Sequence, residues 1–136
     1  MTRVSDPPQT APITAVSHIQ LLVSDVEASA RWYSSVLSLT PFDENLAVGY
    51  VALRQPDAKI VVVLTTRATD KQGSTASSDD AFDHLAFAVT DGDALRAWAV
   101  HLTELGIQHD GVVLEQGRPS LQLRDPDGIA IELVSS

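Results

Sequence analysis

The stretch 18–32 reads "HIQLLVSDVEASARW", and the stretch 84–98 reads "HLAFAVTDGDALRAW". The two stretches carry three unlike residue types in the same register, and each pair is separated by 66 residues: His18 and His84, Asp25 and Asp91, Trp32 and Trp98. Three matches of different chemistry in one register predict an internal duplication. Each copy begins with a histidine inside an apolar strand.

Each copy contains the pattern of a strand followed by a helix. The apolar runs "HIQLLV" and "HLAFAV" lead into "SDVE" and "TDGD", where Ser or Thr precedes an acidic residue by three positions, a helix start signal. In the second copy apolar residues recur at helical spacing, and Gly106 supplies a stop: Leu95, Trp98, Ala99, Leu102 and Leu105. The first copy matches this spacing with Trp32, Tyr33, Val36 and Leu39.

Short strands joined by turns follow each helix. The first half continues with "VGYVALR", the turn "QPDA" and "KIVVVLTT", and the second with "SLQLR", the turn "DPDG" and "IAIELV". We expect a flexible tail over residues 1–12 and a single domain over 13–136. This domain would comprise one module over 13–66, a polar linker over 67–80 and a second module over 81–136. The predicted fold class is α+β, with two mixed sheets curving toward each other around a shared cleft and with the helices outside.

Composition narrows the classes of function. The chain has 136 residues, enough for one domain, and a net charge of −9 argues against nucleic-acid and anionic-membrane partners. No apolar run approaches the roughly 20 residues of a membrane helix, and the first residues lack the features of a secretory signal. The absence of cysteine excludes disulfides and thiolate metal sites. We therefore expect a cytoplasmic protein whose partner is a small molecule.

Strand alternation directs three polar side chains into the predicted cleft. His18 and His84 occupy equivalent positions, and Glu132 is a lone carboxylate in the apolar strand "IAIELV". An unpaired charge is costly to bury, and a divalent metal held by these three side chains would explain it. Taken singly, each histidine could be hydrogen-bonded without binding metal, and Glu132 could face water on an edge strand.

The paired stretches, together with "RDPDGIAIELV", resemble the vicinal oxygen chelate superfamily, which includes glyoxalase I, bleomycin- and fosfomycin-resistance proteins and extradiol dioxygenases. The resemblance implies paired βαβββ modules forming a glyoxalase-like open barrel around a metal, commonly in a homodimer. It also implies ligands from the first and last strand of each module, namely His18, the "KIVVVLTT" strand, His84 and Glu132. The ligand position in "KIVVVLTT" falls on Val62 or Val63, and valine cannot coordinate a metal, so three ligands remain.

The leading hypothesis is a metal-dependent enzyme of the dioxygenase or lyase type that binds the vicinal oxygens of a small molecule. Its ion would be Fe²⁺ or Mn²⁺, with Zn²⁺ or Ni²⁺ as alternatives, and Glu132 would assist proton movement. Gln20, on the same strand face as His18, and Arg118, on a loop near Glu132 in sequence, are the candidate substrate-binding residues. Arg124 opens the "RDPDG" turn and is expected to be structural. His101 and His109 match no ligand position and are expected at the surface.

Two alternatives of other classes stay open. The chain could be a bleomycin-resistance-like protein that sequesters a drug or metabolite without chemistry, which the valine at the fourth ligand position favours and the retained triad opposes. It could also be an interaction module that needs no ligand. The sequence leaves open whether the modules pair within one chain or swap between chains. In a swapped dimer, His18 and His84 of one site would come from different subunits.

Overall fold

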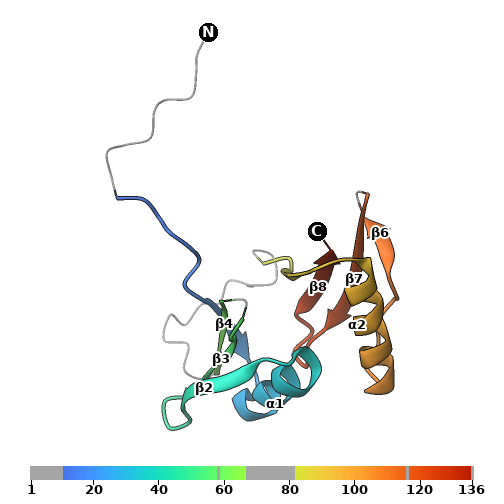
Figure 1. Cartoon of the computed structure of the whole chain (residues 1–136). Helices are drawn as coiled ribbons and strands as arrows, with labels where there is room; N and C mark the ends of the chain where they lie inside the picture. Colours follow the sequence, from blue (N-terminus) through green and yellow to red (C-terminus); the bar gives the residue numbers. More distant parts are fainter. Residues whose placement is uncertain (1–10, 58, 67–81, 116, 136) are drawn as a thin grey trace.

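The computed structural model describes residues 11–57, 59–66, 82–115 and 117–135. Most of the predicted tail and all of the predicted linker lie outside the described residues. The described chain forms two four-stranded sheets and two helices, each helix following the first strand of its sheet (Figure 1).

The first module contains five elements: β1 (Ile19–Val23), α1 (Val26–Leu37), β2 (Thr40–Asn45), β3 (Tyr50–Gln55) and β4 (Ile60–Thr66). Its strands lie in the order β1-β4-β3-β2, with β1 parallel to β4 and the other pairs antiparallel. Strand β2 is exposed along its whole length. The sheet therefore has its apolar strands at one side and a polar strand at the edge.

The second module repeats this arrangement with β5 (Leu85–Val89), α2 (Gly92–Glu104), β6 (Val113–Glu115), β7 (Arg118–Arg124) and β8 (Ala130–Ser135). Its strand order is β5-β8-β7-β6, and β5 is parallel to β8. The predicted α+β class with two βαβββ modules is confirmed. The sequence patterns indicated two strands after each helix, and the structure adds a third to each module, β2 in the first and the short β6 in the second.

Both helices begin at an aspartate. The Asp25 carboxylate accepts a hydrogen bond from the Ala28 backbone N–H at 3.0 Å, and Asp91 accepts from Ala94 at 2.9 Å. Each cap thus lies one residue after the Ser or Thr that the sequence pattern indicated, because the aspartate side chain reaches the N–H groups of the first turn. Helix α2 ends as expected at Gly106, whose φ of 75° favours glycine.

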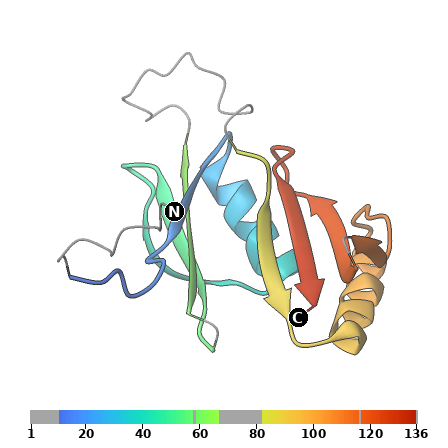
Figure 2. The same cartoon turned by 90° about the horizontal axis from the view of Figure 1, so that it is seen from above.

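The buried apolar residues of both modules, with the exception of Ala52, belong to one hydrophobic cluster. Alternate residues of β1 and β5 face it, including Leu21, Val23 and Leu85, whereas their neighbours are turned to the opposite face. Helix α1 lies between the strands of the two sheets (Figure 2), and α2 packs against β7 and β8. Leu105, which shares the helical spacing of the core residues, is 46% exposed and lies outside this core.

A buried contact joins the modules. The fully buried Tyr33 hydroxyl on α1 donates to Asp125 Oδ2 in the β7–β8 turn at 2.7 Å. Asp125 Oδ1 accepts the backbone N–H groups of Asp127 and Ile129, and the Asp127 carboxylate accepts from Ser24 N. Burial and the neighbouring Asp125 charge raise the pKa of Tyr33, so this hydroxyl stays a donor at neutral pH.

A second inter-module contact corrects one expectation. His101 was expected at the surface, but its side chain is partly buried and Nε2 lies 3.1 Å from the Val36 carbonyl oxygen of α1. Its ring also packs edge-on against Trp98. His101 thus helps to hold α2 against α1.

None of the helices in the described parts of the chain is long and apolar enough to cross a membrane.

Candidate functional site

Strand register identifies the residue that stands at the fourth ligand position. In the second module Glu132 pairs with Ala86, two residues after His84. In the first module the residue that pairs with Gln20, two residues after His18, is Val63. Val63, and not Val62, is therefore the equivalent of Glu132.

The second module forms a pocket of about 390 Å³ on its sheet face. It is lined by His84, Ala86, Phe87, Ala88, Arg118, Ser120, Glu132 and Val134. Two of the three predicted metal ligands therefore share one pocket: His84, which directly precedes β5, and Glu132 on the adjacent strand β8. The predicted substrate-binding residue Arg118 lies in the same pocket.

Each of these two predicted ligands has a hydrogen-bonding partner, on the neighbouring strand for Glu132 and at the preceding position for His84. Gln122 Nε2 on β7 donates to Glu132 Oε2 at 3.2 Å, and the Asp83 carboxylate lies 2.6 Å from His84 Nδ1. A carboxylate on one imidazole nitrogen favours presentation of the other, Nε2, to a metal. Both partners fix the direction of side chains that are themselves half-exposed.

Hydrogen-bond donors lie beside the pair of ligands. Arg118 is exposed, its Nη2 approaches the Ser135 carbonyl oxygen at 3.5 Å, and no described carboxylate forms an ion pair with it. The Ser120 hydroxyl is buried and has no hydrogen-bond partner among the described residues. This half of the site is thus suited to an oxygen-rich group.

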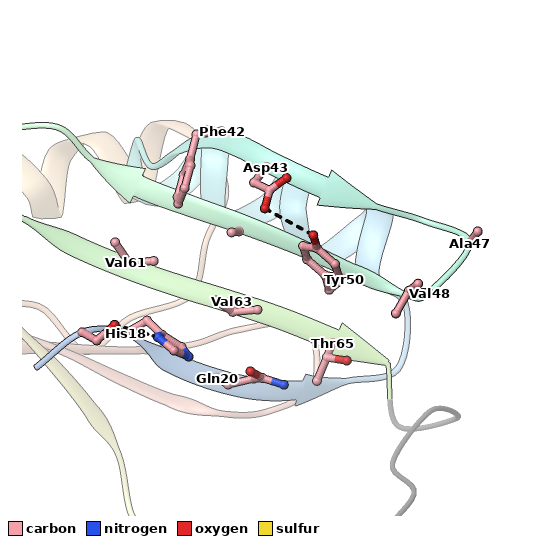
Figure 3. Close-up of a pocket in the computed structure, with 12 residues that line it drawn as sticks. His18, Gln20, Phe42, Asp43, Ala47, Val48, Tyr50, Val61, Val63 and Thr65 are labelled. Atoms are coloured by element: carbon pink, nitrogen blue, oxygen red, sulfur yellow. Dashed lines mark hydrogen bonds between the residues drawn. The ribbon is translucent and has the colours of Figure 1, made fainter.

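The first module forms a larger cavity of about 990 Å³ on the equivalent sheet face (Figure 3). It is lined by Ser17, His18, Gln20, Phe42, Asp43, Ala47, Val48, Tyr50, Ala52, Val61, Val63 and Thr65. Gln20 on β1 and His18, which directly precedes β1, both line the cavity, as alternation predicted. His18 Nδ1 lies 3.0 Å from the Ser17 hydroxyl. The third predicted ligand and the other predicted substrate contact are therefore in this cavity.

One chain does not bring the three predicted ligands together. His18 lines the first-module cavity, whereas His84 and Glu132 line the second-module pocket. Within the part of the chain that the structure describes, no three His, Cys, Asp or Glu side chains are grouped so that they could hold a metal ion. The predicted ligands are thus presented as a pair and a single histidine.

Several residues of these pockets were not predicted. Gln122 interrupts the leucines of "SLQLR" on the same face as Glu132, and Asp83 directly precedes His84, so the sequence held a signal for both. Asp43 comes from β2, "TPFDEN", which has no apolar alternation and was not predicted as a strand. Arg124 has the structural role expected, since its guanidinium donates to the Gly128 carbonyl oxygen across the turn at 2.8 Å.

The sequence matches the family model "Glyoxalase/Bleomycin resistance protein/Dioxygenase superfamily" over residues 15–133. The chain belongs to this superfamily. Its structure is similar to that of a lactoylglutathione lyase from Agrobacterium tumefaciens, with a TM-score of 0.76 and 17% sequence identity over 93% of this chain and 96% of that chain. No curated protein matches the sequence.

Other members of the superfamily show the same architecture. A glyoxylase/bleomycin resistance protein/dioxygenase domain from Frankia sp. EAN1pec has a TM-score of 0.73 and 24% identity, covering 92% of this chain and 93% of that chain. The fosfomycin resistance protein FosX from Listeria monocytogenes has a TM-score of 0.69 and 16% identity, covering 92% and 95%. At these identities the likeness establishes the fold, and the choice of reaction depends on the residues of the site.

Proposed function

We propose that this superfamily member is a metal-dependent enzyme that binds a small molecule through vicinal oxygens, at a site built by two copies of the chain. His84 and Glu132 of one copy and His18 of a second copy would hold the ion. The observation that carries the proposal is the shared pocket of His84 and Glu132, in which each ligand has a hydrogen-bonding partner that orients it.

The side chains of the second module fit a divalent cation. Glu132 is a half-buried carboxylate whose hydrogen-bonding partner, Gln122, is neutral, and no described Lys or Arg forms an ion pair with it. A cation between Glu132 and His84 would compensate this charge. Imidazole and carboxylate ligands suit Fe²⁺ and Mn²⁺, which we propose, and are also compatible with Zn²⁺ or Ni²⁺.

A symmetric homodimer would complete the ligand set twice. Within one chain the Tyr33–Asp125 hydrogen bond and the His101–Val36 contact hold the modules so that their sheet faces form separate pockets. A two-fold axis that sets the first module of one copy against the second module of the other would pair each His18 with His84 and Glu132. In this proposal, therefore, the two modules that form one metal site come from different chains and not from the same chain.

The roles of the residues follow from their chemistry. When bound, the ion would supply Lewis acidity to the vicinal oxygens of the substrate, in a dioxygenase- or lyase-type reaction. Glu132 would accept and return a proton, and the Arg118 guanidinium and the Gln20 amide would bind substrate oxygens from opposite sides. Arg118 suits an oxygen with negative charge because its donors are held beside the ligands.

Mixed dimers test the proposal directly. His18→Ala and His84→Ala homodimers should each bind no stoichiometric Mn²⁺ in a calorimetric titration. A mixed dimer of the two variants would have one site with both histidines intact, so co-purified mixed dimers should regain one Mn²⁺ per dimer. Sites within single chains would leave every site of the mixed dimer defective, and an absence of recovery would contradict the shared site. If both homodimeric variants still bound stoichiometric Mn²⁺, the assignment of His18 and His84 as ligands would be contradicted.

A sequestering protein is the second candidate, favoured by the large first-module cavity with valine at the fourth ligand position. Such a protein would bind its ligand in the presence of a chelator and would not turn it over when loaded with metal. A ligand that raises Tm only in the metal-loaded protein would contradict this second function.

A further inference from the structure

The first-module cavity has an apolar floor formed by short side chains. Ala52, Val61 and Val63 come from the adjacent strands β3 and β4, and the side chains of both valines point from the sheet into the cavity (Figure 3). The part of the sheet face that carries these three short side chains is comparatively flat, and a planar apolar molecule can cover such a surface with little apolar area left in water. A volume of about 990 Å³ is ample for a body of two fused rings.

Aromatic side chains bound this floor on the β2–β3 side. Phe42 is 45% exposed, and the Arg54 guanidinium lies 4.8 Å from the centre of its ring. Arg54 covers the Phe42 ring by a cation–π contact, which fixes the ring at the edge of the cavity. Tyr50 lies along the same side, opposite His18 and Gln20 (Figure 3). A planar ligand would thus be placed between an aromatic edge and the polar side chains of β1.

The charges at this cavity are unevenly placed. Among the described residues that line it Asp43 is the single carboxylate and there is no Lys or Arg, whereas the Arg54 guanidinium lies at the edge, against the Phe42 ring. The Tyr50 hydroxyl donates to Asp43 Oδ2 at 3.2 Å, and the Asp43 charge raises the pKa of Tyr50, which keeps the tyrosine a donor. A carboxylate at this place attracts a cationic or hydrogen-bond-donating group and repels an anionic one.

We propose that the first-module cavity binds a flat, apolar part of the substrate and selects an amine or similar hydrogen-bond donor at Asp43. The inference rests on the proposed function, in which one substrate spans two copies of the chain. Its apolar half would lie in this cavity of one copy, and its oxygen-rich half beside His84, Glu132 and Arg118 of the other copy. The difference in lining between the two pockets supports this division: the larger is apolar with one acid, and the smaller carries the arginine.

Three probes with one ring system test the selection: 2-naphthylmethylamine, 2-naphthylmethanol and 2-naphthoate, titrated calorimetrically with EDTA present. The amine should bind about three- to fivefold more tightly than the alcohol, as an exposed charge pair allows, and naphthoate should bind most weakly. Asp43→Asn should abolish the preference for the amine and leave the alcohol unchanged. Asp57→Asn, an equal charge change in the exposed β3–β4 turn, should keep the order.

A preference for naphthoate, an unchanged preference in Asp43→Asn, or no binding by any probe at millimolar concentration would overturn the inference. Because the chelator removes divalent ions, these outcomes are independent of the metal titrations that test the proposed function. A protein that binds the amine selectively but takes up no metal would contradict the proposed function alone.

Discussion

The two modules share a backbone plan but differ in three positions on their pocket faces. In the second module Glu132 pairs with Gln122 and with Ala86, whereas in the first module Val63 pairs with Ala52 and with Gln20. The second module thus has a carboxylate, Glu132, beside an amide that orients it, Gln122. The first module has Val63 and Ala52 at these two positions. The two modules thus share the scaffold, and a few side chains on one sheet face distinguish the pocket with the two candidate metal ligands from the apolar cavity.

A second difference concerns how the modules contact one another. Tyr33 on α1 reaches the turn of the second module, whereas Ala99, the residue 66 positions later on α2, has no hydroxyl to donate. The contact is therefore made once, in one direction. Together with the His101–Val36 contact it holds the two modules in the arrangement in which their pockets are separate within a chain.

The largest expected effect compares the two equivalent positions of the ligand strand. Glu132→Ala should weaken Mn²⁺ binding by at least about 100-fold, because it removes a charged ligand from the pocket. Val63→Ala should change the affinity less than twofold, since no ligand is lost. Calorimetric titration of both variants measures this, with Tm as a control for folding. Similar losses in the two variants would show that the modules do not differ in metal chemistry.

The sequence predicted the repeated scaffold because its signals are local. Three signals depend on neighbouring residues: alternation in "HIQLLV" and "HLAFAV", a Ser or Thr followed by an acidic residue three positions later at both helix starts, and the turns before the last strands. Strand β2 was not predicted from the sequence because it is exposed on both faces and pairs only along one edge. Its polar sequence has no period to detect.

The relative placement of the two pockets could not be predicted from the sequence, for a different reason. It depends on Tyr33 and Asp125, which are 92 residues apart in sequence and meet only after both modules have folded. The two candidate histidines were predicted from their equivalent positions, and Glu132 was predicted as a lone charge in an apolar strand. Their division into a pair and a single histidine required the placement of the modules.

The inter-module bond gives the next largest effect. Tyr33→Phe should lower the free energy of unfolding by about 2 kcal/mol, because it removes the hydroxyl that donates a charge-assisted hydrogen bond to Oδ2 of the buried Asp125. Urea denaturation at pH 7 measures the loss. Tyr50→Phe is the control, since it removes a tyrosine–aspartate bond that is exposed and within one module. An equal loss in Tyr50→Phe would contradict the special role of the contact between modules.

The same variant has a predicted pH dependence. Burial raises the pKa of Tyr33 in the folded state above its unfolded value of about 10. The folded protein therefore keeps this proton while the unfolded chain loses it, so the stabilisation is complete below pH 10 and falls as the pH rises further. The gap in stability between the wild type and Tyr33→Phe should narrow above pH 10. A gap that stays constant would show that Tyr33 is not the group that titrates.

A smaller effect is expected at the residue that orients Glu132. Gln122→Leu should weaken Mn²⁺ binding by about tenfold, as for other groups that hold a metal ligand without touching the metal. Gln108→Leu, on an exposed loop, is the matched control. A role in folding alone would change Tm and leave the metal affinity of the folded protein intact. The combined Gln122→Leu, Glu132→Ala variant should be no worse than Glu132→Ala, because the amide acts through the carboxylate.

The smallest effect tests what the modules have in common. Asp25→Ala and Asp91→Ala each remove one capping bond and should each lower the free energy of unfolding by about 1 kcal/mol. Asparagine at either position should restore most of the loss because its side-chain oxygen can still accept. The two sites share no partner, so the double variant should lose the sum. A clearly larger loss of stability at Asp25 would mean that α1 and α2 are not equivalent even at their first turns. Helix α1 also carries the contact with the second module. The difference between the modules would then extend from the pocket face into the scaffold.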